Sequence, residues 1–201
     1  ANALRAMRGR VDGLIVMAPH LSAEVLQAAL PPALPSLFIN GPEEIDDRPT
    51  VRLDNVGAME AMVAHLTAGG RRRIVHIAGP EGNVDARERV EGYRAAMARH
   101  APGIEPVVLA GDFSEETGEA AARTILDNAI PCDAVFAAND MMAIGCLQTL
   151  QNAGVDVPGT IAVAGFDDVP LARYLRLTTV RVRIAEMGAR AILRLIDILE
   201  G

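Results

Sequence analysis

The amino-acid sequence predicts an α/β fold in which two parallel sheets form two lobes. Short runs rich in β-branched and other apolar residues alternate along the chain with longer runs that have helical spacing. The short runs are apolar almost throughout, which is typical of parallel strands covered by helices on both faces. Two extended polar segments, residues 46–55 and 175–184, are unlike tight connections and could carry the chain between the two sheets.

Each expected strand is a short run bounded by glycine, proline or polar residues. The expected strands cover residues 11–17, 35–40, 50–54, 73–79, 105–111, 133–138 and 160–166. The helices expected between them are Ser22–Ala29, Val56–Ala68, Ala86–His100, Glu115–Asp127, Asp140–Ala153 and Glu186–Leu199. Residues 1–10 also have a helical pattern and stand directly before a strand, so we expect the chain to be a fragment of a longer protein.

The charge of the chain disfavours nucleic acid as a direct partner. Its formal net charge is −7, and every basic side chain apart from the histidines is arginine. Because phosphate contacts dominate nucleic-acid affinity, an acidic chain binds DNA poorly. The dense basic run, residues 71–73, is interpreted as a solvated edge of the sheet.

Several features predict a cytoplasmic protein that is not embedded in a membrane. No apolar run reaches the roughly 18 residues that a membrane span needs, and no signal peptide is visible. Cys132 and Cys146 lack the spacing of a metal or redox pair. We interpret them as reduced, buried thiols, as expected of a cytosolic protein.

Polar side chains follow five consecutive strands at the point where each strand ends. Open parallel sheets bind ligands beyond the carboxyl ends of their strands. Amides, carboxylates and arginines suit neighbouring hydroxyl groups, and an aromatic ring can cover the apolar face of a sugar or base. The set therefore predicts a pocket for a polyol-like ligand. In chain order it comprises Asn40; Asn83, Asp85, Arg87 and Arg89; Asp112 and Phe113; Asn139 and Asp140; and Asp167 and Asp168.

Each of these residues also has a purely structural interpretation. Asn139 could cap the helix that follows it, and Asp140 fits a first-turn acid that stabilises the helix dipole. Arg87 and Arg89 point in different directions on a helix, so one of them is expected to face solvent or a salt bridge. One member of the pair Asp167–Asp168 could serve only a turn. Asp112 could be a cap, and Phe113 could belong to the core.

Enzyme classes find no support in the sequence. Nucleotide-binding glycine loops and the serine-hydrolase G-x-S-x-G pattern are missing from it. The four histidines are scattered, and no nucleophile–base pair or metal cluster is visible. We therefore expect no catalytic residues, no metal and no cofactor.

Several long motifs follow one another in a fixed order, at residues 50–80, 86–97, 111–126, 132–168 and 177–192. Together they resemble the effector-binding core of the lactose/galactose-repressor family of bacterial transcription regulators, and the resemblance covers nearly the whole chain from Val11 onward. It implies a periplasmic-binding-protein-like fold, in which three crossovers join two α/β lobes. It also implies a small effector, usually a sugar or nucleoside-type molecule, between the lobes.

The family's functional residues can be matched one by one. Arg89, in the "RVEGY" stretch, matches the arginine that clamps the ligand, and Phe113 of "GDF" matches the ring that stacks over it. Asn139 of "AAND" and Asp167 of "GFDD" match the amide and the carboxylate that bind hydroxyls. By the same resemblance, the predicted ligand residues also include Asn40, Asn83 and Asp85, whereas Asp140 stays with its helix and Arg87 is not the clamp.

The resemblance also implies a division of the chain and what is missing from it. Residues 1–53 and 182–201 would form an incomplete N-terminal lobe, and residues 54–181 would form the C-terminal lobe. The family's helix-turn-helix, its hinge helix, the first strands of the N-terminal lobe and the segment after Leu199 are not present. In addition, the chain is slightly short between residues 168 and 177, and Ile184 stands where the family often has proline.

The resemblance implies a ligand-sensing core of a transcriptional regulator. An effector would modulate operator binding by a separate N-terminal helix-turn-helix in a homodimer, with dimer contacts near Val56–Ala68 and Ile144–Ala153. Met59 and Met62 could lie on that surface, although the core is their default place. The alternative is a periplasmic sugar-binding protein of a transporter, which would share the fold and the pocket.

Overall fold

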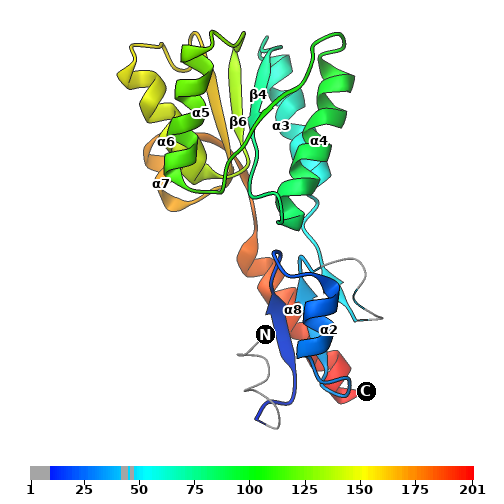
Figure 1. Ribbon diagram of the computed structural model, residues 1–201. Helices are drawn as coiled ribbons and strands as arrows, with labels where there is room; N and C mark the ends of the chain where they lie inside the picture. The colour runs from blue at the N-terminus through cyan, green and yellow to red at the C-terminus, as the bar shows by residue number, and fades with distance from the viewer. Residues whose placement is uncertain (1–9, 42–44, 46–47) are drawn as a thin grey trace. The chain divides into compact units, whose positions relative to one another are not determined.

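The computed structural model describes residues 10–41, 45 and 48–201, so the predicted N-terminal helix and Asp46–Asp47 of the first predicted crossover lie outside the described residues. The chain forms two compact units (Figure 1). Unit 1 comprises Ala1–Leu53, Asn83–Asp85 and Arg183–Gly201, and unit 2 comprises Asp54–Gly82 and Ala86–Val182. The chain therefore passes from unit 1 to unit 2 after residue 53 and returns to unit 1 after residue 182. Between these points, the short segment Asn83–Asp85 also belongs to unit 1.

The sheet of unit 1 is parallel, and its strands follow the order β1-β2-β3. β1 spans Leu14–Met17, β2 spans Ser36–Ile39 and β3 spans Thr50–Val51. Leu14 pairs with Ser36, and Phe38 pairs with Thr50. β3 is shorter than the predicted strand, because regular pairing stops before Arg52.

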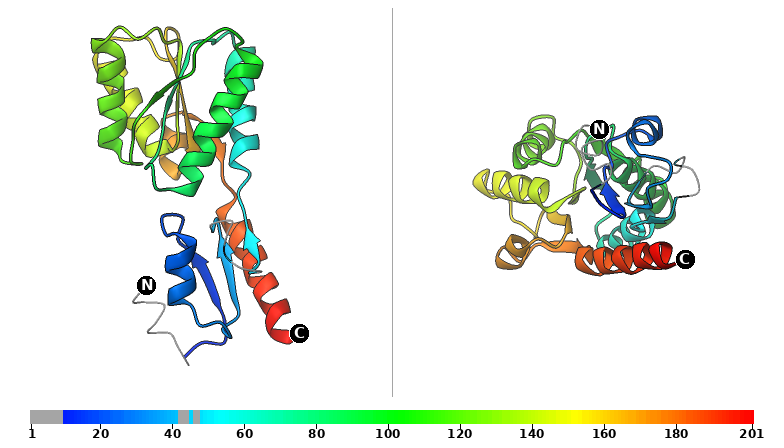
Figure 2. Two further views of the ribbon diagram at one scale, coloured as in Figure 1. Left: turned by 45° about the vertical axis from the view of Figure 1, so that its right-hand side comes forward. Right: turned by 90° about the horizontal axis from the view of Figure 1, so that it is seen from below.

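Two helices cover the opposite faces of this sheet (Figure 2). α2 (Ala23–Ala29) begins after the N-cap Ser22, and its Leu26 packs with Leu14 and Val16 of β1. α8 spans Ile184–Glu200 on the other face. Many of its large apolar side chains are exposed; they are Ile184, Ile192, Leu193, Ile196, Ile198 and Leu199.

The sheet of unit 2 is also parallel, and its strands follow the order β5-β4-β6-β7-β8. Its strands are β4 (Ile74–Ile77), β5 (Val107–Leu109), β6 (Ala134–Ala137), β7 (Ala162–Asp167) and β8 (Thr178–Arg181). The predicted α/β class with parallel sheets is confirmed. β8 lies in a segment predicted only as an extended crossover, because an edge strand with polar side chains has no continuous apolar run to reveal it.

Helices cover both faces of this second sheet. Figure 1 shows α3 (Asn55–Ala68) and α4 (Val84–His100) on one side of the strands and α5 (Glu115–Asp127) and α6 (Asp140–Asn152) on the other. A short helix, α7 (Pro170–Tyr174), was not predicted; it begins at a proline, which is pre-organised for the first helical position. The backbones of α5 and α6 lie so close that a Cβ atom on Gly118 would be 2.0 Å from the Met142 carbonyl oxygen.

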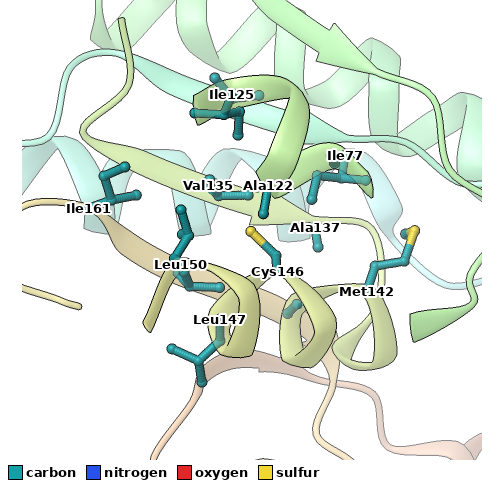
Figure 3. Packing of buried hydrophobic residues seen from close by; sticks show 14 of the residues in the cluster. Ile77, Ala122, Ile125, Val135, Ala137, Met142, Cys146, Leu147, Leu150 and Ile161 are labelled. Carbon is teal, nitrogen blue, oxygen red and sulfur yellow. The ribbon is translucent and has the colours of Figure 1, made fainter. Parts of the chain in front are cut away.

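One large apolar cluster of unit 2 lies between its sheet and the helices α5 and α6. Cys146 of α6 sits at the centre of this cluster, among apolar side chains of both helices and of β4, β6 and β7 (Figure 3). Burial raises the pKa of the Cys146 thiol to about 12 and that of the half-buried Cys132 to about 11. Both cysteines are free thiols, as predicted, but only Cys146 is buried as expected, because Cys132 lies at the margin of the cluster.

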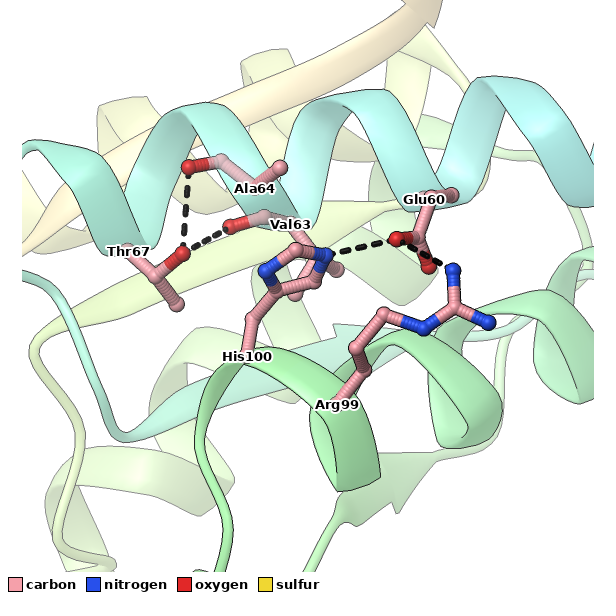
Figure 4. Close-up of polar contacts among 6 residues, drawn as sticks. All are labelled: Glu60, Val63, Ala64, Thr67, Arg99 and His100. Carbon is pink, nitrogen blue, oxygen red and sulfur yellow. Dashed lines mark hydrogen bonds and ion pairs between the residues drawn. The ribbon is translucent and has the colours of Figure 1, made fainter.

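α3 and α4 are joined by a small polar cluster at the C-terminal end of α4 (Figure 4). Glu60 accepts bonds from Arg99 at 2.9 Å and His100 at 2.6 Å. The hydrogen bond from His100 lowers the pKa of the Glu60 carboxyl, and Arg99 lowers it further. The inner face of α3 is apolar: Met59 and Met62 are buried, as their default interpretation predicted.

Candidate ligand-binding site

Four of the predicted ligand residues lie on unit 2 at or beyond the carboxyl ends of its strands. Phe113 follows β5, Asn139 follows β6, and Asp167 is the last residue of β7. Arg89 comes from α4 and reaches the backbone directly after β6. Since the strands are parallel, these ends share one edge of the sheet, and the predicted grouping within unit 2 follows from the topology.

Arg89 is held rigidly at this edge. Its side chain is buried, and its Nε donates to Asn55 Oδ1 at 2.9 Å while one terminal nitrogen donates to the carbonyl of Ala138. The guanidinium carbon lies 3.8 Å from the centre of the Phe166 ring, in the geometry of a cation–π contact. Arg87, two residues earlier, is exposed, as the helical spacing predicted. The clamp candidate is therefore pre-organised.

Asn55 and Phe166, the two residues that fix Arg89, are not among the residues predicted from the sequence. Asn55 is the first residue of α3 and is buried; its Nδ2 donates to Glu88 Oε2 at 2.7 Å. Phe166 is fully buried near the end of β7. The available signals were a polar residue just after a helix cap and an aromatic just before a strand end, and neither identifies a partner by itself.

Phe113 has an unusual backbone and a closely packed ring. Its φ is 74°, in the left-handed region that residues other than glycine seldom adopt. A Cβ atom built on Gly79 would lie 2.3 Å from Cε1 of the ring, so the ring rests directly on the Gly79 backbone. The ring is half-buried. The structural interpretation as ordinary core is therefore incomplete, because part of the ring stays accessible.

Asp112 builds the turn between Phe113 and α5. Its Oδ1 accepts the backbone N–H of Ser114 at 2.9 Å and the hydroxyl of Thr117 at 2.9 Å. Its bonds with Ser114, followed by that with Thr117, lower the pKa of the Asp112 carboxyl. Ser114 is the N-cap of α5. The structural interpretation of Asp112 fits these contacts.

Asn139 is the N-cap of α6 and also contacts the Phe113 loop. Its Oδ1 accepts the N–H of Met142 at 2.9 Å, and its Nδ2 donates to the Phe113 carbonyl at 2.9 Å. A side-chain amide has two N–H groups and two acceptor lone pairs, so these two bonds use half of its capacity. The capping role is therefore observed, and a direct role toward a ligand stays a prediction.

The turn after β7 contains two residues with positive φ, Asp167 at 109° and Asp168 at 60°. Asp168 pairs with Arg181 of β8. The N–H of the next residue, Val169, donates to Asp140 Oδ2 at 2.8 Å. Asp168 thus has an ion-pair partner on the neighbouring strand β8, and Asp167 remains the predicted ligand residue of the pair.

Unit 1 contains the other predicted residues. Asn40 follows β2, is buried and has a φ of 50°. Its Oδ1 accepts the N–H of Leu53 at 2.8 Å, and its Nδ2 donates to Asp85 Oδ2 at 3.3 Å. Asn83 precedes α4 and is half-buried. Asn40 and Asp85 therefore form a buried pair at the start of α4.

Strained backbone is concentrated among the predicted ligand residues. The described residues other than glycine with positive φ are Asn40, Phe113, Ala129, Asp167, Asp168 and Arg176. Three of these six, Asn40, Phe113 and Asp167, were predicted to bind ligand. Such conformations cost free energy and cluster at functional sites, where surrounding contacts enforce them. Their positions support the predicted site.

Three further observations concern the described residues outside the predicted set. They contain no group of three or more histidine, cysteine, aspartate or glutamate residues that could hold a metal ion. A surface pocket of about 580 Å³ lies at the opposite end of the unit 2 sheet, beside Arg71, Pro158 and Leu177, and contains none of the predicted residues. Within the part of the chain that the structure describes, no helix has the length and apolarity to cross a membrane.

His76, in the middle of β4, is completely buried. Its Nδ1 lies 2.7 Å from the Phe136 carbonyl oxygen, and its ring stacks on Tyr93. Burial lowers the pKa of His76 to about 4, against the effect of the Phe136 bond, and the cations Arg89 and Arg94 lower it further. His76 is therefore a neutral core residue.

The chain matches known proteins over most of its length. Residues 63–201 match the periplasmic binding protein-like domain. The HTH-type transcriptional regulator CelR of Thermobifida fusca is 34% identical over 198 residues, which cover 95% of this chain and 58% of that protein. The ribose operon repressor of Escherichia coli is 35% identical over 192 residues, covering 92% of this chain and 58% of the relative. The chain thus spans less than two thirds of these relatives.

Solved structures give the same result. A LacI transcriptional regulator from a Rhodococcus species matches with a TM-score of 0.90 and 31% identity, over 99% of this chain and 75% of that one. The lac repressor dimer bound to operator and the anti-inducer ONPF matches with a TM-score of 0.89 and 28% identity, over 100% of this chain and 71% of that one. The chain therefore belongs to the periplasmic-binding-protein-like family, as an effector-binding domain of the LacI (lactose/galactose-repressor) type.

Proposed function

We propose that this chain is the ligand-sensing core of a bacterial transcriptional regulator and binds a small sugar or nucleoside-like effector. The observation that carries the proposal is the pre-organised set at the strand ends of unit 2. There, Arg89 is fixed by Asn55 and by the Ala138 carbonyl, close to the loops of Phe113 and Asp167 in the topology. Asn40, Asn83 and Asp85 of unit 1 contribute further ligand contacts in this proposal.

The chemistry of these side chains fits a ligand rich in hydroxyl groups. Arg89 offers donors in a fixed plane, Asp167 offers acceptors, and Asn139 offers one of each beyond its present bonds. The partly exposed ring of Phe113 can cover an apolar sugar or base face. Because the donors and acceptors are already held in place, binding costs little ordering of side chains.

The regulatory step is a shift between conformations. An effector changes the activity of the regulator only through a difference in its affinity for two conformations. In this proposal, the full-length protein carries an N-terminal helix-turn-helix that binds operator DNA, and the acidic chain described here does not bind DNA itself. The lac repressor, a structural relative, has been solved bound to operator and an anti-inducer.

The regulator acts as a homodimer in this proposal, which suits paired operator half-sites. The resemblance places the dimer contacts near Val56–Ala68 and Ile144–Ala153, and this proposal adds α7 to them. Unit 2 exposes three large apolar side chains on and just after α7: Leu171 is 45% exposed, Tyr174 82% and Leu175 42%. A second copy of the chain would cover them. Sedimentation equilibrium should show a dimer that Tyr174→Arg weakens, whereas Arg87→Glu, on the exposed side of α4, should leave it unchanged.

A ligand screen tests the proposed effector site. Thermal unfolding of the full-length protein is measured with D-ribose, D-glucose, maltose, adenosine and cytidine, because a ligand that binds only the folded state stabilises it. A ligand at a hundred times its Kd should stabilise the protein by about 2.7 kcal/mol. Arg89→Ala and Asp167→Ala should remove this shift, and Arg87→Ala is the matched control that should keep it. A shift that survives both substitutions would place the site elsewhere.

The same assay separates the rival functions. We propose that the protein has no enzymatic turnover, needs no metal or cofactor and works in the cytoplasm. Product formation from a stabilising ligand, lost in Asp167→Asn, would instead indicate a hydrolase. A periplasmic sugar-binding protein of a transporter was the alternative. The curated relatives given above are regulators, which supports the regulator, and a secretion signal encoded directly upstream would contradict it.

A further inference from the structure

The turn that carries Asp167 is held by a buried carboxylate from another element, that of Asp140 in α6. Asp140 is fully buried, and a Cβ atom on Gly165 of β7 would lie 2.2 Å from its Oδ1. The carboxylate therefore packs directly on the β7 backbone, two residues before Asp167. This contact is separate from the place of Asp140 in the first turn of α6.

Both oxygens of Asp140 are used in this contact. Oδ2 accepts the N–H of Val169 at 2.8 Å, and Oδ1 accepts the hydroxyl of Thr179 at 2.6 Å. The Thr179 oxygen in turn accepts the N–H of Asp168 at 3.4 Å. The two residues thus bind the two backbone N–H groups that come directly after Asp167. Burial raises the pKa of Asp140, while the bonds from Thr179 and Val169 act in the opposite direction.

These bonds explain how two consecutive aspartates keep positive φ angles. Asp167 at 109° and Asp168 at 60° would relax to ordinary conformations unless surrounding contacts enforced the turn. The N–H groups of residues 168 and 169 would also lose their partners on relaxation, which is costly where they are partly buried. Asp140 and Thr179 therefore determine the direction in which the chain leaves β7.

We propose that Asp140, acting with Thr179, is a positioning residue that sets the orientation of the Asp167 carboxylate toward the effector. This inference rests on the proposed function of Asp167 as a ligand contact. Asp140 does not contact the ligand itself in this proposal, because none of its surface is exposed and its oxygens are turned to Val169 and Thr179. A helix-dipole role alone would stabilise α6 and leave the ligand affinity unchanged.

The first test uses amide hydrogen exchange of the full-length protein without ligand. Asp140→Asn and Thr179→Val should accelerate exchange at Asp168 and Val169, and Thr179→Ser, which keeps the hydroxyl, should restore slow exchange. The matched control is Asp133→Asn, because Asp133 also accepts a backbone N–H, that of Arg73 at 2.9 Å, but before β6 begins. Unchanged exchange at residues 168 and 169 in Asp140→Asn would overturn the inference.

The second test measures the Kd of whichever screened sugar or nucleoside stabilises the wild type. Asp140→Asn and Thr179→Val should weaken binding by about tenfold or more, since a small misplacement of a binding group has effects of this size. The Kd of Thr179→Ser and of Asp133→Asn should stay within about twofold of the wild-type value. A twofold change corresponds to less free energy than one hydrogen bond contributes. Wild-type affinity in Asp140→Asn would refute the positioning role. If the Asp140→Asn variant does not fold, the affinity of Thr179→Val decides whether the positioning role holds.

If none of the screened ligands stabilises the wild type, the proposed function fails for those ligands. The hydrogen-exchange result still decides whether Asp140 holds the turn.

Discussion

The ring of Phe113 rests on the backbone of Gly79, where a Cβ atom would lie 2.3 Å from Cε1 and 2.4 Å from Cζ. The contact joins the loop after β5 to the loop after β4. It leaves the ring no room to move toward the sheet, so its place at the predicted site depends on a missing methyl group.

Gly79→Ala should therefore displace Phe113 and weaken effector binding. Overpacking a close contact costs about 1–3 kcal/mol of stability, and the displaced ring should lower affinity by a similar free energy, about tenfold. Thermal unfolding and ligand titration measure the two effects. Gly82→Ala is the control, because no atom lies within 4 Å of a Cβ at Gly82. Equal affinity in both variants would show that the ring does not contact the ligand.

Asn55→Ala should lower the affinity for the effector, although Asn55 is not itself a predicted ligand contact. It removes the hydrogen bond between Arg89 Nε and Asn55 Oδ1, and a hydrogen bond to a charged group is worth about 1.5–3 kcal/mol. Arg89 then becomes mobile, and ligand affinity falls as well. Denaturant unfolding and titration should show both losses. The exposed Asn152 provides the comparison: Asn152→Ala should change neither quantity.

The stability of the protein should fall in mild acid because of His76. The fold holds the pKa of His76 at about 4, below its ordinary value of 6.5, so the folded state binds a proton less readily than the unfolded chain. The contribution of neutral His76 to the free energy of unfolding is complete above pH 6.5 and is lost as the pH falls toward 4. The loss between pH 7 and pH 5 should be about 2 kcal/mol.

Urea unfolding at these two pH values measures the loss, and His76→Gln should reduce the difference by this amount. His20→Gln, at an exposed residue, should leave the pH dependence of the wild type unchanged. A pH dependence that is the same in His76→Gln and wild type would assign the acid sensitivity to other groups.

Substitution by serine should lower the stability of the protein by different amounts at the two cysteines. Cys146 is completely buried in the apolar cluster of unit 2, so Cys146→Ser should destabilise the protein by about 1–3 kcal/mol. Cys132 is half-buried, and its Sγ already donates to the Ala134 carbonyl at 3.1 Å, a bond that a serine hydroxyl can also make. Cys132→Ser should therefore have a small effect in denaturant unfolding. A larger loss at Cys132 would contradict this description of the core.

Much of the fold could be predicted from local pattern. The apolar runs and helical spacing indicated the seven strands from β1 to β7 and the six longer helices, to within a few residues at their ends. β8 and α7 were missed: β8 is a polar edge strand, and α7 is only five residues long, too short for a period to be visible.

The candidate site was predicted in part. That polar residues follow each strand is visible in the sequence, and parallel topology brings the ends of one sheet together. The cap at Asn139 was also visible. The partners of these residues were not: Arg89 bonds to Asn55 across 34 residues, and Asp140 bonds to Thr179 across 39.

The sequence by itself determined the α/β class, the parallel strands and the family, because these depend on short-range periodicity and on motifs of contiguous residues. Only the tertiary structure decided what each polar residue does. Asp140 was interpreted from sequence as an acid at a helix start, and the fold makes it the acceptor for Val169 and Thr179. The positive φ angles of Phe113 and Asp167 likewise arise from contacts with distant segments, which local preference opposes and the packed chain enforces.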